Sequence, residues 1–157
     1  MNEPRLEVSA GVWTDLISGI RTRGAGTRES GAFLLGDVVD GSRRVRQIAP
    51  YEELEQAAAL SNHVRLTNRA FQKLWDTCAC DRVQVVADIH SHPFGATQSR
   101  SDRENPMIAL KGHIALIVPY FAMRGTSPSD VTINEYIGAH RWRTFDKRAN
   151  ERILIIV

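Results

Sequence analysis

The residues best suited to chemistry are two histidines and an aspartate: His90 and His92 are separated by one serine, and Asp102 follows ten positions later. The residues at 83–87 are rich in β-branched side chains, which predicts a buried strand. Side chains two apart on a strand point to the same face, so both imidazoles would project to one side at the strand's end. A proline and a glycine then turn the chain, so the carboxylate of Asp102 could return to the same place. Two imidazoles and one carboxylate can hold a tetrahedral zinc ion with a fourth position left for water, which is a catalytic arrangement.

A fourth residue of interest, Glu29, stands at the start of an apolar stretch. The stretch predicts a buried strand over 33–39, and the dipeptide at 40–41 predicts a hairpin turn into a strand over 43–48. A glutamate at the start of a strand is usually solvated. Its meaning therefore depends on what lies beside it in space.

Two amphipathic helices are predicted around these strands. Apolar residues recur at helical spacing over 8–20, with Ser9 as the N-cap, and again over 66–78, with Thr67 as the N-cap. The segment 50–60 is polar and then alanine-rich, which predicts a loop with a short helix.

The region around Asp102 also predicts a helix N-terminus, with two competing starts. The residues 101–104 have the form of a capping box. Alternatively, Asn105 caps a helix whose first residue is Pro106. Either start leaves Asp102 near a helix N-terminus, which favours its ionised, metal-binding form.

The C-terminal part of the chain predicts further strands over 113–118, 131–139 and 153–157. His113 starts the first of them and is expected to be a hydrogen-bonded structural residue. The charged segment 141–143 is typical of an edge strand. Strands interleaved with two or three helices indicate a layered α/β domain in which some strands pair antiparallel.

Length and composition are typical of one globular domain. The chain has 157 residues, of which 43% are hydrophobic and 24% charged, and its net charge of +2 gives little support for a nucleic-acid partner. Cys78 and Cys80 are too close for an easy disulfide and are expected to be buried free thiols. No signal-peptide pattern and no apolar run of about 20 residues is present. We therefore expect a soluble, cytoplasmic protein without a membrane partner.

Other His-x-His proteins fit less well. A cupin barrel would place a glutamate a few residues after the second histidine, where residues 95–97 are Gly, Ala and Thr. A metal-dependent amidohydrolase barrel takes about 250 residues. A zinc deaminase needs His-x-Glu followed by Pro-Cys-x-x-Cys, which this sequence lacks.

Taken together, Glu29, the segment His90-Ser91-His92-Pro93, Ser99 and Asp102 resemble the JAMM (MPN-plus) zinc metalloproteases, and most of all their stand-alone prokaryotic, deubiquitinase-like members. The pattern of that family is a distant glutamate, then His-(Ser/Thr)-His-Pro, then Ser-x-x-Asp. The resemblance implies that residues 1–157 form a single MPN (cytidine-deaminase-like) α/β domain, with a curved mixed β-sheet flanked by helices.

Carried over to this sequence, the resemblance implies that His90, His92 and Asp102 bind Zn²⁺. Glu29 would be the general base that takes a proton from water and returns it to the leaving amine, and Ser99 would donate a hydrogen bond to the developing oxyanion. The implied activity is cleavage after the C-terminal Gly-Gly of a ubiquitin-like protein, by deconjugation or precursor processing in a bacterial pathway. The implied partners are that protein or its conjugates and E1-like and E2-like proteins of the same pathway.

The sequence departs from the family pattern at three points. The spacing from His92 to Ser99 is one residue shorter than is common, Gln98 replaces a frequent proline, and Ala32 stands where a glycine is usual. Two alternatives share this pattern: a hydrolase that processes a sulfur-carrier protein, and a non-catalytic MPN scaffold that binds partners.

Overall fold

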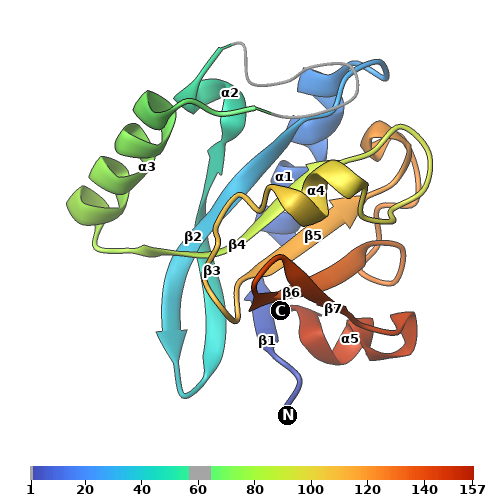
Figure 1. Ribbon diagram of the computed structural model, residues 1–157. Coiled ribbons are helices and arrows are strands. Elements are labelled where there is room, and N and C mark those ends of the chain that lie inside the picture. The colour runs from blue at the N-terminus through green and yellow to red at the C-terminus, as the bar shows by residue number, and fades with distance from the viewer. Residues whose placement is uncertain (1, 57–64) are drawn as a thin grey trace.

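The strand that ends at the two histidines lies in the middle of a large mixed sheet. In the computed structural model, which describes residues 2–56 and 65–157, eight strands form this sheet in the spatial order β7-β6-β5-β4-β2-β3-β1-β8 (Figure 1). The strands are β1 (Arg5–Val8), β2 (Gly31–Val39), β3 (Ser42–Pro50), β4 (Gln84–Ser91), β5 (Ile114–Val118), β6 (Thr132–Gly138), β7 (Arg141–Thr144) and β8 (Leu154–Ile156). The central strand β4 pairs antiparallel with β2 and parallel with β5. The predicted α/β class, with a mixed sheet flanked by helices, is confirmed.

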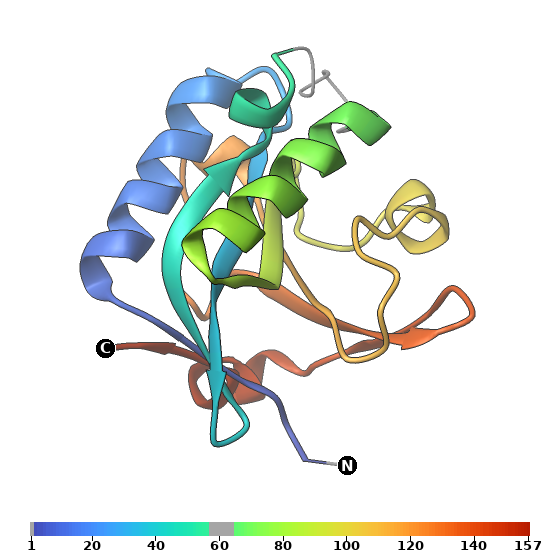
Figure 2. The same cartoon turned by 90° about the vertical axis from the view of Figure 1, so that its left-hand side faces the viewer.

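Helices cover both faces of the sheet. They are α1 (Ala10–Gly24), α2 (Tyr51–Leu54), α3 (Asn68–Asp81), α4 (Arg100–Glu104) and α5 (Asn150–Ile153), with 3-10 turns η1 (Tyr120–Ala122) and η2 (Lys147–Ala149). Helix α1 lies on one side of the sheet and α3 on the other (Figure 2). Within the described residues, none of the helices combines the length and the apolar character that crossing a membrane requires.

The alternation of side chains along β2 divides the interior into two cores. Ala32 and Leu34 pack with buried residues of α1, whereas Phe33 and Leu35 pack with α2 and α3. A fully buried leucine or phenylalanine contributes about 1.5–3 kcal/mol relative to an exposed one. Because both faces are covered, β2 reads as a continuous apolar run in the sequence.

Both predicted helix caps are confirmed. The side chain of Ser9 accepts a hydrogen bond from the backbone N–H of Val12, and that of Thr67 accepts one from Ala70. Helix α1 continues beyond the predicted end to Gly24, because the left-handed conformation that ends it is adopted by Ala25.

Other expectations need correction. The strand β1 was not predicted, because it has only four residues and gains its stability from pairing between β3 and β8. Both cysteines are free, but neither is buried: Cys78 is half-buried and Cys80 is exposed, because the end of α3 faces solvent. The predicted short helix in 50–60 is α2, and the part of that segment beyond residue 56 lies outside the described residues.

Candidate metal centre

The two histidines lie at the carboxyl end of β4 and point to the same face, as the strand period predicts. The Nε2 atoms of His90 and His92 are 2.9 Å apart, and both residues are buried. The backbone of His92 is fixed on both sides, because its N–H donates to the carbonyl of Val118 and its carbonyl accepts from Phe121. The direction of both imidazoles therefore depends on the pairing of β4 with its neighbours.

Asp102 reaches the same point from the first turn of α4. This helix begins at Arg100 with Ser99 as its N-cap, so both predicted helix starts are wrong, although the placement of Asp102 near a helix N-terminus is confirmed. Ser99 and Asp102 form a capping box in which Ser99 Oγ accepts from the Asp102 N–H and Asp102 Oδ2 accepts from the Ser99 N–H, at 3.1 and 2.7 Å. The helix ends before Pro106, which could not continue it.

The three side chains converge, so that one ligand atom from each lies within 4.8 Å of the others. Asp102 places Oδ1 3.3 Å from His90 Nε2 and Oδ2 3.1 Å from His92 Nε2. Ligand atoms about 2.0 Å from a tetrahedral zinc ion lie about 3.3 Å from one another. His90, His92 and Asp102 could therefore hold a metal ion.

The charges of this group shift its pKa values in opposite directions. Burial alone would raise the pKa of Asp102, but hydrogen bonds from His90 and His92 outweigh it and hold the pKa far below its usual range. Burial alone would lower the pKa of His90, but the hydrogen bond and charge of Asp102 outweigh it and raise the pKa. Before a cation binds, the aspartate is thus ionised and attracts positive charge.

Glu29 is buried beside this group, two residues before the start of β2. The antiparallel register pairs Gly31 with His90, and Ser91 donates its N–H to the carbonyl of Ser30, so Glu29 comes level with the second histidine. Its side chain is 5% exposed and makes no hydrogen bond or ion pair with the other residues of 2–56 and 65–157.

The pKa of Glu29 reflects this position. Burial raises it above its usual value, the two histidines act in the opposite direction, and the charge of Asp102 adds to the rise. A buried carboxyl group with a raised pKa, close to other titratable groups, is typical of a residue that exchanges protons.

The close approach of β2 to β4 requires a glycine at position 31. A Cβ atom there would lie 2.3 Å from the carbonyl oxygen of Ile89, 2.6 Å from the Tyr51 ring and 2.9 Å from the Cβ of His90. Gly31 thus allows the strand that follows Glu29 to lie against the strand that carries the histidines.

Ser99 is exposed and lies next to Asp102. Its oxygen accepts the Asp102 N–H, and its own hydroxyl proton has no acceptor among residues 2–56 and 65–157, so it can be donated to another group. The structure therefore brings the predicted residues His90, His92 and Asp102 together, places Glu29 beside them, and places Ser99 at the cap of the helix that carries Asp102.

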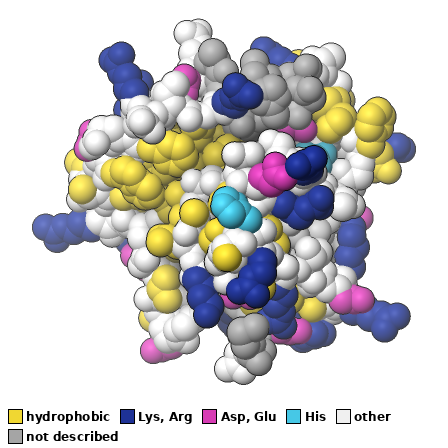
Figure 3. Space-filling model, in the orientation of Figure 1, with side chains coloured by type: hydrophobic (Ala, Val, Ile, Leu, Met, Phe, Trp, Pro, Cys, Tyr) yellow, Lys and Arg dark blue, Asp and Glu magenta, His cyan; other side chains and the backbone are white. Residues whose placement is uncertain are grey.

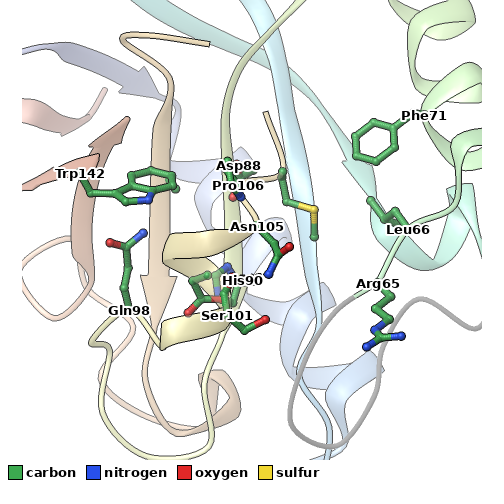
Figure 4. Close-up of a pocket in the computed structure, with 13 residues that line it drawn as sticks. Arg65, Leu66, Phe71, Asp88, His90, Gln98, Ser101, Asn105, Pro106 and Trp142 are labelled. Carbon is green, nitrogen blue, oxygen red and sulfur yellow. Dashed lines mark hydrogen bonds and ion pairs between the residues drawn. The ribbon is translucent and has the colours of Figure 1, made fainter. Parts of the chain in front are cut away.

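A cavity of about 610 Å³, here called the main cavity, opens beside His90 and Asp102. Figure 4 shows Trp142 and Gln98 on one side of His90, and Leu66 and Phe71 on the other. The cavity therefore extends on both sides of His90.

Asp88 lines this cavity and was not singled out in the sequence. It lies two positions before His90 on the same face of β4, and its Oδ2 is 2.5 Å from Nε2 of His113, so His113 has the structural role predicted for it. The spacing of Asp88, His90 and His92 was the available signal. Ala115, the partner of Asp88 on β5, has too small a side chain to fill the space beside it.

Comparison with known proteins supports the fold but assigns no family. No protein-family model matches the chain. A protein from Desulfitobacterium hafniense, solved in solution, is 14% identical with a TM-score of 0.68, over 97% of this chain and 92% of that one. A solution structure of a protein from Salinibacter ruber is 20% identical with a TM-score of 0.56, over 90% of this chain and 88% of that one. At these identities, the similarity shows a shared fold only.

Proposed function

We propose that this chain is a JAMM-type zinc peptidase with an MPN (cytidine-deaminase-like) fold. The proposal rests on one observation: His90 Nε2 and His92 Nε2 lie 2.9 Å apart, and each is 3.1–3.3 Å from one of the two carboxylate oxygens of Asp102. Glu29 is buried beside them and has no partner among the described residues. The sequence resemblance assigns this set of residues to a hydrolytic zinc site, and the geometry of the set agrees with that assignment.

The chain's own residues would do most of the work of hydrolysis. A bound zinc ion supplies a Lewis acid that acidifies water and polarises the substrate carbonyl. Glu29 takes the proton of the attacking water and passes it to the nitrogen of the leaving amine. Ser99, whose hydroxyl proton has no acceptor in the described part of the chain, donates a hydrogen bond to the oxygen that becomes negatively charged, which is worth about 3 kcal/mol of barrier. No nucleophilic side chain is required.

The substrate in this proposal is a ubiquitin-like protein that is cut after its C-terminal Gly-Gly. This assignment is taken from the sequence resemblance. Two glycines have no side chain, so their backbone can approach buried groups such as His90 and Glu29 closely. The main cavity extends on both sides of His90 and can take the residues before and after the scissile bond. The partner in this proposal is the ubiquitin-like protein or its conjugate, and E1-like and E2-like proteins of the same pathway are further candidate partners.

The decisive experiment combines metal analysis with cleavage of fusions in which a candidate ubiquitin-like protein precedes a reporter. We expect one zinc ion per chain and cleavage directly after Gly-Gly. The Glu29→Gln variant should keep its zinc and lose at least about 100-fold in kcat, whereas Glu53→Gln, which changes an exposed carboxylate on α2, should match the wild type.

Two results would contradict the proposal. Full zinc occupancy with unchanged turnover in Glu29→Gln would show that this residue is not the base. A chain that neither binds zinc nor cuts any fusion would be a non-catalytic scaffold.

A further inference from the structure

A second cavity, here called the cationic pocket, adjoins the candidate metal site. It has a volume of about 330 Å³ and lies between the loop before α4 and the strands β6 and β7. Gln98 and Trp142 line both this pocket and the main cavity, and Arg103, the neighbour of Asp102, lines the cationic pocket. Trp142 also donates its indole N–H to the carbonyl of Arg103. The two cavities are therefore neighbours that share a wall.

The cationic pocket is lined by donors and by no carboxylate of the described residues. Arg103 and Lys147 bring positive charge, and His140 brings an imidazole. The remaining polar lining is made of hydroxyl and amide side chains, namely Thr97, Gln98, Thr132, Asn134 and Thr144. Figure 3 shows Lys and Arg side chains close to the central histidine of this view, together with an acidic side chain.

The two cations keep most of their donors free within the described structure. Arg103 donates one N–H of its guanidinium to the carbonyl of Gln98, out of five. Lys147 donates to the carbonyl of Asp130, which uses one of its three protons. Both groups are held in place by uncharged carbonyls, so their charge is not neutralised by these contacts.

Carboxylates next to the lining residues in the sequence have partners of their own. Glu104 pairs with Arg100 at 2.7 Å, and its charge also interacts with Arg103 and His140. Asp130 accepts from Ser127, and Asp146 accepts from the backbone N–H of Arg148 at the start of η2. The pocket thus has the positive charge and the hydrogen-bond donors that an anion requires. One of its residues, Arg103, directly follows the candidate metal ligand Asp102.

We propose that the cationic pocket binds the free α-carboxylate at the C-terminus of the substrate. This inference rests on the proposed hydrolytic function and narrows it: the bond that is cut lies a few residues before the end of a chain, as in the trimming of a precursor. Every polypeptide with a free C-terminus carries an α-carboxylate within a few residues of its last peptide bonds. Arg103 and Lys147 select it with charge-assisted hydrogen bonds.

The reaction remains a simple hydrolysis. Water adds across the C–N bond, its oxygen joining the carbonyl carbon and its proton joining the nitrogen of the released fragment. That fragment leaves with a new amino group and with the carboxylate that the pocket held. In an isopeptide conjugate the lysine is followed by the rest of a protein, so such a carboxylate is absent close to the bond.

The test measures binding separately from catalysis. Metal-free protein labelled with ¹⁵N is titrated with a hexapeptide that has Gly-Gly at its centre, either with a free C-terminus or as the C-terminal amide, and the indole N–H signal of Trp142 is followed. We expect the acid to bind about tenfold more tightly than the amide. Lys147→Gln and Arg103→Gln should each reduce this preference, and Arg103→Lys should restore part of it.

The matched control is Arg141→Gln, which removes the same charge from an exposed residue outside the lining, and it should keep the preference. Equal binding of acid and amide, no change in the Trp142 signal, or equally strong binding of inorganic phosphate would overturn the proposal. With the zinc-loaded enzyme, the same preference should appear in KM. Failure to cut either peptide, with the binding preference intact, would reject the hydrolytic function and leave a carboxylate-binding site.

Discussion

The hydroxyl of Ser91 contacts both polar backbone atoms of Ser30. Ser91 Oγ accepts from the Ser30 N–H at 3.1 Å and donates to the Ser30 carbonyl at 3.3 Å, while the Ser91 N–H donates to the same carbonyl at 2.9 Å. Ser91 thus joins the strand that carries the two histidines to the segment that carries Glu29. Ser91 lies between the two histidines, and its side chain points to the opposite face of the strand. There it holds the backbone next to Glu29 in place.

Ser91→Ala removes this connection without touching a proposed metal ligand. We expect the variant to bind zinc normally, to lose about 1 kcal/mol of unfolding free energy, and to lose about tenfold in kcat because Glu29 is held less firmly. Zinc analysis, urea unfolding and turnover of a fusion substrate measure these three effects. Unchanged kcat would show that Glu29 is positioned by other contacts.

Gly31→Ala should damage the site through the backbone. Its Cβ would lie 2.3 Å from the Ile89 carbonyl oxygen, so β2 and β4 would have to separate and His90 would shift. We expect weaker zinc binding and a loss of several kcal/mol in stability. Gly11→Ala is the control, because a Cβ at this helical position meets nothing within 4 Å; it should be neutral or stabilising by about 0.5–1 kcal/mol. Equal stability of the two variants would contradict the close approach of the strands.

Two substitutions at Ser99 separate its capping role from its proposed catalytic one. Glycine is nearly as good an N-cap as serine, whereas alanine costs about 1 kcal/mol. The Ser99 N–H that holds Asp102 Oδ2 belongs to the backbone and stays in both variants. If the hydroxyl stabilises the oxyanion, Ser99→Gly and Ser99→Ala should both retain zinc and lose about 100-fold or more in kcat. A loss in Ser99→Ala that is absent from Ser99→Gly would assign the residue to capping alone.

The pH dependence of stability in chelator-treated protein should reveal the pair of Asp102 and His90. The lowered pKa of Asp102 gives stability that is present above its unfolded value and is lost as the pH falls through the folded one. The raised pKa of His90 gives stability that is present below its unfolded value and is lost as the pH rises through the folded one. The free-energy difference between wild type and Asp102→Asn should therefore be largest between about pH 4 and 6.5. A difference that grows steadily from acid to alkaline pH would contradict the pairing.

Much of the fold could be predicted because it depends on local periodicity. The helical spacing of apolar residues located α1 and α3, and Ser9 and Thr67 are the caps that their positions favoured. The two histidines share a face because any strand has a period of two. These features need only neighbours along the chain, which the sequence displays directly.

The parts that could not be predicted depend on register between distant segments. The contact of Ser30 with Ser91 spans 61 residues, and no local pattern fixes which residue of β2 faces which residue of β4. The pairing of Asp88 with His113 likewise follows from the parallel alignment of β4 and β5. The cationic pocket exists only because the β6–β7 hairpin is folded against α4, as the bond from Trp142 to Arg103 shows.

The methyl group of Ala115 has a consequence for how selectivity could be altered. Position 115 lies on a rigid inner strand and borders the hollow beside His90, yet it contributes no ligand atom. Valine, leucine or methionine at this position would progressively shrink this space without replacing any of the three candidate metal ligands. One position on β5 thus offers a means to retune substrate size independently of the chemistry.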